Sequence, residues 1–256
     1  MESTDATAVE RFWTLGSRSE RTRHGLVRVN PAAPDQPLGN CLAEPDWPPG
    51  ALDHALTGVA AVTGRACRRV LVDRRTPAVV EAELALADWR PDQLVLLRLA
   101  EPQPGPAAEF DGRLRRITAE HDWSALTALF RIDHLEEDRR AGRPGRPAES
   151  TEQSITLRRS LTGASWFLAE RAGDPVGAIA SWLDPGATGV IEDVFVHPAH
   201  RGHGIATAMI ATLVGRLRTR GARTVVIAAA ADDTPKHLYA GLGFRPFAVT
   251  RSYLRD

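Results

Sequence analysis

The sequence predicts an α/β protein with a mixed β-sheet, built as a longer C-terminal domain and a smaller N-terminal α/β domain. Three observations support this fold class. The chain has 256 residues, which suits two domains better than one. In the C-terminal part, apolar strand-like segments flank an amphipathic helical segment. Residues 100–108, with three prolines and a glycine, read as a linker between domains at 1–104 and 112–256.

The C-terminal domain is predicted to begin with a short strand, two helices and a three-stranded series. Asp122 is the candidate N-cap of the first helix, and Ser150 or Thr151 that of the second. Gly173-Asp174-Pro175 is typical of a hairpin turn. The predicted strands are Leu114–Ile117, Ser165–Glu170, Val176–Trp182 and Val190–Val196.

A strand, helix, strand unit is predicted next. Gly204 opens a helix with one apolar face, and Gly221 ends it. The following apolar strand, Thr224–Ala229, is expected to run parallel to the strand before the helix, through a right-handed crossover. A short helix from Thr234 to Leu242 and a last strand, Phe247–Leu254, complete the domain.

The N-terminal part repeats the end of this pattern. A strand at Val70–Asp73 is followed by Thr76-Pro77, which opens a helix, and then by Trp89-Arg90-Pro91. The corresponding order in the C-terminal domain is Val225-Val226-Ile227, Thr234-Pro235 and Phe244-Arg245-Pro246. This interpretation predicts two copies of one structural unit.

Composition excludes several function classes. Basic and acidic side chains balance at 32 each, without the basic excess typical of a nucleic-acid binder. The two cysteines, Cys41 and Cys67, form no CxxC pair, which favours a reduced, cytoplasmic compartment. No apolar run approaches the ~20 residues of a membrane span, so we expect no membrane partner. The arginine-rich basic set is typical of a GC-rich, bacterial genome.

The segment Arg201-Gly-His-Gly-Ile-Ala206 is the candidate phosphate-binding motif, because it is a glycine-rich turn between a strand and a helix. The first amides of a helix have no intrahelical acceptor, and they carry the positive end of the helix dipole. A pyrophosphate can accept from several of these amides together. Gly204 lets the backbone approach the phosphate, Ala206 stays small for the same reason, and Gly202 relaxes the turn.

Three motifs together resemble the GCN5-related N-acetyltransferases (GNAT): Ile191-Glu-Asp-Val-Phe-Val-His-Pro198, the Arg201–Ala206 turn, and Leu238-Tyr-Ala-Gly-Leu-Gly-Phe244. The resemblance covers about residues 112–256. It implies a GNAT fold with acetyl-CoA wedged where two parallel strands splay. Backbone groups of Val194, Phe195 and Val196 are expected to pair with the pantetheine arm.

The same resemblance implies the remaining cofactor contacts. Asp232 stands near where many members have an asparagine that bonds the cofactor. The pyrophosphate is expected on the backbone of Arg201, Gly202, His203, Gly204, Ile205, Ala206 and Thr207.

Two side chains are the candidate catalytic residues. Tyr239 is the candidate acid, because the family places this hydroxyl near the thioester sulfur and a phenol can protonate a departing thiolate. Glu192 is the candidate base, acting directly or through water, with Asp193 in reserve. Strand alternation predicts Glu192, Val194 and Val196 on one face and Asp193 and Phe195 on the other.

The spacing of His197, His200 and His203 invites a metal interpretation. We expect no metal there, because the run contains Pro198, is not helical and ends in the phosphate turn. Histidines that lend charge to phosphate are the simpler account.

The function predicted from these residues is acetyl transfer from acetyl-CoA to a primary amine of a small molecule. The alternatives are a protein acetyltransferase, acting on lysine or an N-terminus, and a non-catalytic acyl-CoA sensor. Aligning Trp89 with Phe244 gives a shift of 155 (244 minus 89), which places Leu84 at the position of Tyr239. The N-terminal domain is therefore predicted to be a degenerate GNAT-like copy without a cofactor site. Its predicted role is to form a wall of the acceptor cleft or to form a homodimer.

Overall fold

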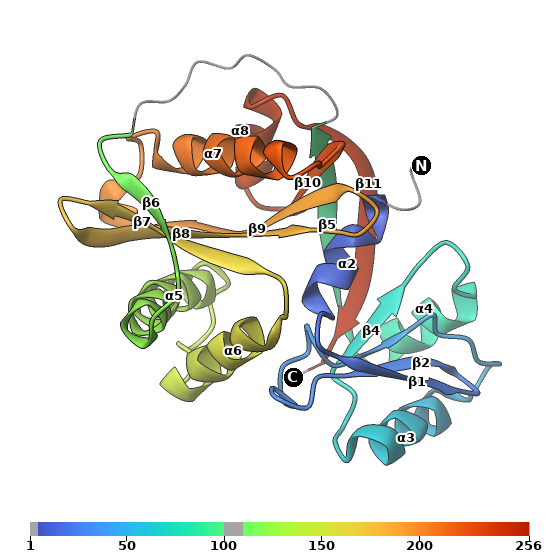
Figure 1. Ribbon diagram of the computed structural model, residues 1–256. Coiled ribbons are helices and arrows are strands. Elements are labelled where there is room, and N and C mark those ends of the chain that lie inside the picture. The colour runs from blue at the N-terminus through green and yellow to red at the C-terminus, as the bar shows by residue number, and fades with distance from the viewer. Residues whose placement is uncertain (1–4, 100–109, 256) are drawn as a thin grey trace.

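The structure is a computed structural model that describes residues 5–99 and 110–255. The predicted linker, 100–108, lies outside the described residues. Within them, eleven strands form one mixed sheet in the order β1-β2-β3-β4-β11-β5-β10-β9-β8-β7-β6. Helices cover both faces (Figure 1). The fold class predicted from the sequence is confirmed.

In the C half, the elements follow the predicted order. Helices α5 and α6 lie on one face of the sheet, and α7 and α8 on the other (Figure 1). The elements are β6 (Arg113–Arg116), α5 (Glu120–Arg140), α6 (Ala148–Ser160), β7 (Ser165–Arg171), β8 (Asp174–Leu183), β9 (Thr188–Val196), α7 (Ile205–Thr219), β10 (Thr224–Ala230), α8 (Pro235–Gly241) and β11 (Arg245–Leu254).

Helix α7 is the crossover that makes β9 and β10 parallel. It buries Ile205, Met209, Leu213 and Leu217, which lie on the single apolar face that the sequence predicts. These side chains pack with β-strand residues in one core beneath α7. Burial of this face, more than helix propensity, stabilises the helix.

The N half has the same order of elements at smaller size. Three strands precede a helix, a strand parallel to the third, a second helix and a last strand, and α2 precedes them all. The elements are α2 (Ala8–Trp13), β1 (Arg18–Thr22), β2 (Gly25–Val29), β3 (Cys41–Ala43), α3 (Leu52–Thr63), β4 (Arg69–Val72), α4 (Ala78–Leu86) and β5 (Arg90–Leu99).

The ends of α4 and α8 show that the two halves are repeats. The amide of Trp89 donates to the carbonyl of Leu84 at 3.0 Å, and the amide of Phe244 donates to that of Tyr239 at 3.0 Å. The intervening Asp88 and Gly243 both have positive φ, 60° and 90°. The shift of 155 residues therefore superposes one helix ending on the other.

Each half completes its sheet with the last strand of the other half. Strand β5 of the N half lies between β10 and β11, and β11 of the C half lies between β5 and β4. All three contacts are antiparallel. The sequence predicted β11 but not β5, because Pro91 and Asp92 weaken the strand pattern at its start. The exchange makes one continuous sheet out of two repeats.

Candidate active site

The parallel strands β9 and β10 separate at one point. Their pairs run from Thr188 and Thr224 to Ile191 and Ile227, where the recorded pairing in the described chain ends. On its opposite edge β10 pairs with β5 from Val225 to Ala230, so only its pairing with β9 stops at this point. The backbone edge of β9 that faces β10 is thereby opened along the last residues of the strand.

A cleft of about 500 Å³ opens at this separation. Its volume is within the roughly 300–1,000 Å³ typical of small-molecule sites. It is lined by the end of β9, the turn before α7, the start of α8 and one side of α5. The lining residues are Asp133, Glu137, Arg140, Val194, Phe195, Val196, His200, Arg201, Gly202, Gly204, Ile205, Ala206, Thr207, Asp233, Thr234, Pro235, Leu238 and Tyr239.

The glycines of the turn before α7 both have left-handed backbone. Gly202 has φ 79° and Gly204, the N-cap residue, has φ 74°. A side chain at Gly204 would strain this conformation. The turn aims the first amides of α7 at the cleft, and those amides have no acceptor within the helix. An arrangement of this kind, at a helix N-terminus, suits the binding of an anion.

The side chain of Arg201 holds this turn against α5. Both terminal nitrogens donate to the Glu136 carboxylate at 2.6 Å, and Nε donates to the Val196 carbonyl at 3.0 Å. A guanidinium so engaged positions the turn through its contacts. The backbone of Arg201 is not engaged in these contacts and follows the course of the turn.

Two residues predicted to contact the cofactor do not line the cleft. His203 Nδ1 lies 2.8 Å from the Arg201 carbonyl oxygen within the turn itself. Asp232 precedes the cleft wall, and the neighbouring Asp233 lines it instead. Contacts of His203 and Asp232 with a cofactor stay predictions.

Three polar residues of α5 in the cleft were missed by sequence reasoning. Asp133, Glu137 and Arg140 lie at spacings of four and three residues, so they share one helix face. The signal was present in the sequence as a charged stripe beside the apolar one. A charged helix face is most often only solvated, and the tertiary structure alone places this one against β9.

Tyr239 on α8 is 4% exposed and lines the cleft. Its ring lies 6.5 Å from that of Phe244, which anchors the helix end in the core. Burial, followed by the negative charges of Glu192 and Asp233, raises the pKa of the phenol. Tyr239 therefore stays protonated at neutral pH and can act as a donor.

The predicted alternation of side chains along β9 is wrong at Glu192, which lies on the side of Asp193 and Phe195 and not on that of Val194 and Val196. The pairing with β8 shifts register between Ala178, opposite Phe195, and Ala180, opposite Glu192. Asp193 has φ 54° at this bulge. An extra residue in one strand breaks the two-residue period. Asp193 and Glu192 consequently reach the same side of the sheet, where Arg158, Trp166 and Trp13 lie.

Asp193 is held in a buried ion pair. Arg158 donates to both carboxylate oxygens at 2.7 and 2.8 Å, and Trp166 Nε1 donates at 2.9 Å. The Arg158 guanidinium lies 4.3 Å from the centroid of the Phe130 ring. Both carboxylate oxygens of Asp193 therefore have partners, and its part as the reserve base stays a prediction.

Glu192 lies beside this pair, under α2. Trp13 hydrogen bonds to its side chain, and Oε1 is buried without a partner among the described residues. Burial first, and then Asp193, raises the pKa of Glu192 well above its ordinary value. A buried carboxyl of this kind holds its proton to higher pH than a solvated one.

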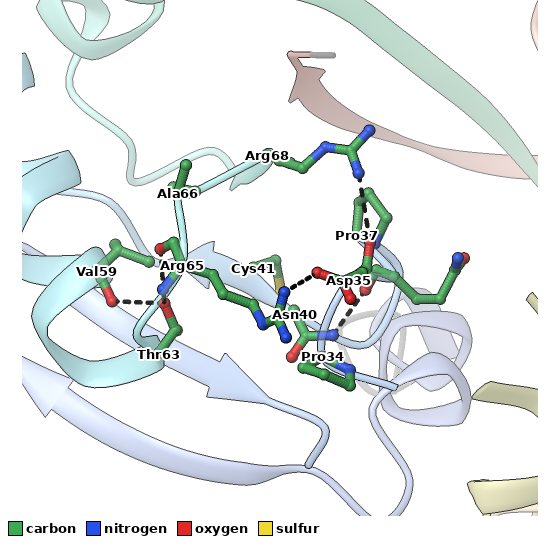
Figure 2. A pocket seen from close by; sticks show the side chains of 12 residues that line it. Pro34, Asp35, Pro37, Asn40, Cys41, Val59, Thr63, Arg65, Ala66 and Arg68 are labelled. Atoms are coloured by element: carbon green, nitrogen blue, oxygen red, sulfur yellow. Dashed lines mark hydrogen bonds and ion pairs between the residues drawn. The ribbon is translucent and has the colours of Figure 1, made fainter. Parts of the chain in front are cut away.

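A small hollow in the N half lies between β3 and α3 (Figure 2). Its volume of about 20 Å³ suits one water molecule and not a nucleotide. Both cysteines line it. Burial raises the pKa of Cys41, and that of Cys67 to about 12, so both thiols stay protonated and are poor nucleophiles.

Residues 5–99 and 110–255 show neither a metal-ligand cluster nor a membrane-spanning helix. No group of three or more His, Cys, Asp or Glu side chains there could hold a metal ion. His197 and His200 stack edge-on, with ring centroids 5.6 Å apart. In the same part of the chain, no helix combines the length and apolarity needed to cross a bilayer.

Comparisons with known proteins converge on one family. The Acetyltransferase (GNAT) family matches residues 126–244. A mycothiol acetyltransferase of Thermobispora bispora is 28% identical over 248 residues, which cover 90% of this chain and 79% of that protein.

Two solved structures share the fold along nearly the whole chain. A GCN5-related N-acetyltransferase from Kribbella flavida superposes with a TM-score of 0.65 at 15% identity, covering 100% of this chain and 95% of that one. A tandem GNAT protein from the clavulanic acid biosynthesis pathway superposes with a TM-score of 0.55 at 19% identity, covering 98% and 86%. The predicted GNAT fold with a degenerate N-terminal copy agrees with these likenesses.

Proposed function

We propose that this chain, a member of the GNAT family of acyltransferases, transfers an acetyl group from acetyl-CoA to a primary amine of a small molecule. The observation that carries the proposal is the cleft. It combines an open strand edge, a helix N-terminus behind left-handed glycines, and the protonated phenol of Tyr239.

The residues present fit acetyl-CoA as co-substrate. Amides at Gly204 and the first turn of α7 would hold the pyrophosphate, since they face the cleft and lack helical acceptors. Backbone groups of Val194–Val196 would pair with the pantetheine arm along the edge that β10 leaves open. When bound, the thioester supplies an activated acetyl group.

Tyr239 is the proposed acid. Its hydroxyl would protonate the departing CoA thiolate, because its raised pKa keeps the proton in place until the C–S bond breaks. Glu192, the base predicted from the sequence, lies beside Trp13 and outside the cleft lining, so in that role it would need a water to reach the amine. Much of the rate would come from holding amine and thioester together in the cleft.

A small-molecule acceptor is favoured by the relative from Thermobispora bispora, which is named for mycothiol. Among the acidic side chains of the cleft, Glu137 is paired with Arg146 and Asp233 with Arg140, which leaves Asp133 to attract a cationic amine. An acceptor panel should therefore hold small diamines, amino sugars and the deacetylated form of mycothiol, together with lysine-containing peptides for a protein-directed activity.

Calorimetry with acetyl-CoA and a free-thiol assay with the amine panel test the proposal. We expect binding by the wild type and thiol release with at least one small amine. Gly204→Val should abolish measurable binding, because it forces a β-branched residue into left-handed backbone. Gly215→Ala on α7, where an added Cβ meets open space, is the matched control and should bind normally.

Two outcomes would contradict it. Absence of heat with acetyl-CoA would refute the cofactor site. Tight binding without turnover on any amine would favour a non-catalytic acyl-CoA sensor.

A further inference from the structure

We propose that Asp133 of α5 binds the ammonium group of the acceptor in the cleft and accepts its proton. The inference deepens the proposed function and rests on it. It names a residue outside the strand motif as the proton acceptor, and it identifies the substrate class as a cationic primary amine.

Asp133 differs from the other acidic side chains of α5 in having no arginine partner. In the described part of the chain, no hydrogen bond or ion pair engages its carboxylate. The others pair as Glu120 with Arg159, Asp122 with Arg115, Glu136 with Arg201, and Glu137 and Asp138 with Arg146. A half-buried carboxylate left without a partner in a cleft is available to a ligand.

The charges that act on Asp133 come from three elements. Glu136 and Glu137 lie on its own helix, Asp193 on β9, and Arg158, the one opposing charge among the main influences, on α6. Arg158 is already bound to Asp193. The other ionisable residues that line the same cleft are Arg140, His200, Arg201, Asp233 and Tyr239.

The resulting environment suits a proton acceptor. Burial, followed by the neighbouring acidic charges, raises the pKa of Asp133 to about 7. A general base works best when its pKa lies near the working pH. A cationic ligand beside Asp133 would also reduce the repulsion between Asp133 and its acidic neighbours. The same acidic surroundings would therefore help to bind the ammonium group and to remove its proton.

The proton movements balance. Asp133 takes one proton from the ammonium, and the freed lone pair attacks the thioester carbon to form the C–N bond. As the C–S bond breaks, Tyr239 donates its proton to the thiolate. The second nitrogen proton restores the Tyr239 hydroxyl, and Asp133 releases its proton to water. The products are amide, free thiol and one proton.

Glu192 is less suited to meet the amine first. It does not line the cleft that Tyr239, Val194 and Asp133 share. Its carboxyl is covered by Trp13 and buried beside Asp193, which disfavours the charged form. The cleft lining includes Asp133 and no residue of α2.

The first experiment compares the pH dependence of transfer in Asp133→Asn, Asp133→Glu and Glu192→Gln with that of the wild type. We expect wild-type kcat/KM to rise with pH through about 7, as Asp133 loses its proton. Asp133→Asn should lower kcat/KM by about 10²-fold and remove that rise, within the range for a general base. Asp133→Glu should restore the rise. Glu152→Gln on exposed α6 surface is the charge-matched control.

The second experiment needs no catalysis. A carboxyl whose folded pKa is raised stabilises the protein at low pH and loses that contribution as pH rises through the folded value. Asp133→Asn should therefore melt above the wild type at pH 8, with the difference declining to its low-pH value near pH 4. Glu152→Gln should show no such trend.

The outcomes separate the two proposals. If the wild type neither binds acetyl-CoA nor releases thiol, the proposed function fails and this inference fails with it. If the wild type does both, the inference alone is overturned by an Asp133→Asn variant that keeps the wild-type rate and pH profile, or by a melting difference that does not change with pH.

Discussion

The two halves of this molecule share one topology but differ at the place where a cofactor would bind. In the C half, the turn between β9 and α7 has two left-handed glycines and opens on a cleft of about 500 Å³. In the N half, the segment between β3 and α3 contains Glu44, Pro45, Asp46 and Trp47. It has no R-x-x-G-x-A turn, and its carboxylates would repel a pyrophosphate.

In the N half, a carboxylate from the same half lies next to the start of α3. Glu83 accepts from Trp47 Nε1 at 2.9 Å and from the amide of Gly50, just before the helix. With the shift of 155, Glu83 corresponds to Leu238, a residue that lines the cleft in the C half. The N half thus places a carboxylate of its own next to the start of α3, whereas the corresponding position in the C half holds the apolar Leu238. One fold supports both states, so the chemistry resides in a few residues at the turn and on the second helix.

The largest effect should come from the buried pair that places the two carboxylates of β9, a feature of the C half. Arg158 is 7% exposed in its side chain, and Arg158→Met leaves Asp193 buried without its partner. We expect the free energy of unfolding to fall by about 3–5 kcal/mol, measured by urea denaturation. The double variant Arg158→Met with Asp193→Asn should recover part of the loss. Equal losses in single and double variants would contradict the pairing argument.

Tyr239 is the sharpest chemical difference, since the N half has Leu84 there. Tyr239→Phe keeps the packing and removes only the hydroxyl. We expect kcat to fall by about 10²-fold while the Kd for acetyl-CoA stays the same, because an acid acts in the transition state. Single-turnover kinetics and calorimetry measure the two quantities. An unchanged kcat would remove Tyr239 from the role of acid.

Leu238→Glu would make the C half resemble the N half. Leu238 is 37% exposed, so the fold should tolerate the change. The new carboxylate would compete with a phosphate for the amides of α7, and we expect the Kd for acetyl-CoA to rise about 10-fold, or about 1.4 kcal/mol. Leu238→Gln is the uncharged control and should have a smaller effect. Equal Kd values for the two variants would show that charge at this position is irrelevant.

The smallest effect should come from the reciprocal change, Glu83→Gln in the N half. It weakens the hydrogen bonds to Trp47 and Gly50, so the free energy of unfolding should fall by about 1 kcal/mol. Acetyl-CoA binding should not change, because the N half supplies none of the cleft residues described above. A changed Kd for acetyl-CoA would contradict the proposal that only the C half binds the cofactor.

Much of the local structure was predictable. The helix that begins after Gly204, the hairpin through Asp174 and the parallel pair around α7 follow from apolar periodicity and turn residues, which depend on neighbours in sequence. The repeat was also visible, since Trp89 and Phe244 mark the same helix ending. Such patterns involve residues close in sequence, so they can be recognised without knowing which elements pack together.

Other features depend on register between distant segments. Nothing near Asp193 in the sequence signals a bulge that puts Glu192 on the same side of the sheet as Asp193, or the pairing of Asp193 with Arg158, 35 residues away. Pro91 and Asp92 weaken the local pattern of strand β5, and its partners, β10 and β11, come more than a hundred residues later in the chain. Asp133 sits on a charged stripe that becomes part of a cleft only when α5 packs beside β9.

The sequence by itself determined the order of elements in the C half, the glycine turn before α7 and the position of Tyr239, because backbone sterics and periodicity act over a few residues. The tertiary structure decided which carboxylates share a face, how the halves exchange their last strands and which acidic side chain of α5 lacks an arginine. Those outcomes depend on packing and charge pairing between segments far apart in the chain, and no local pattern encodes them.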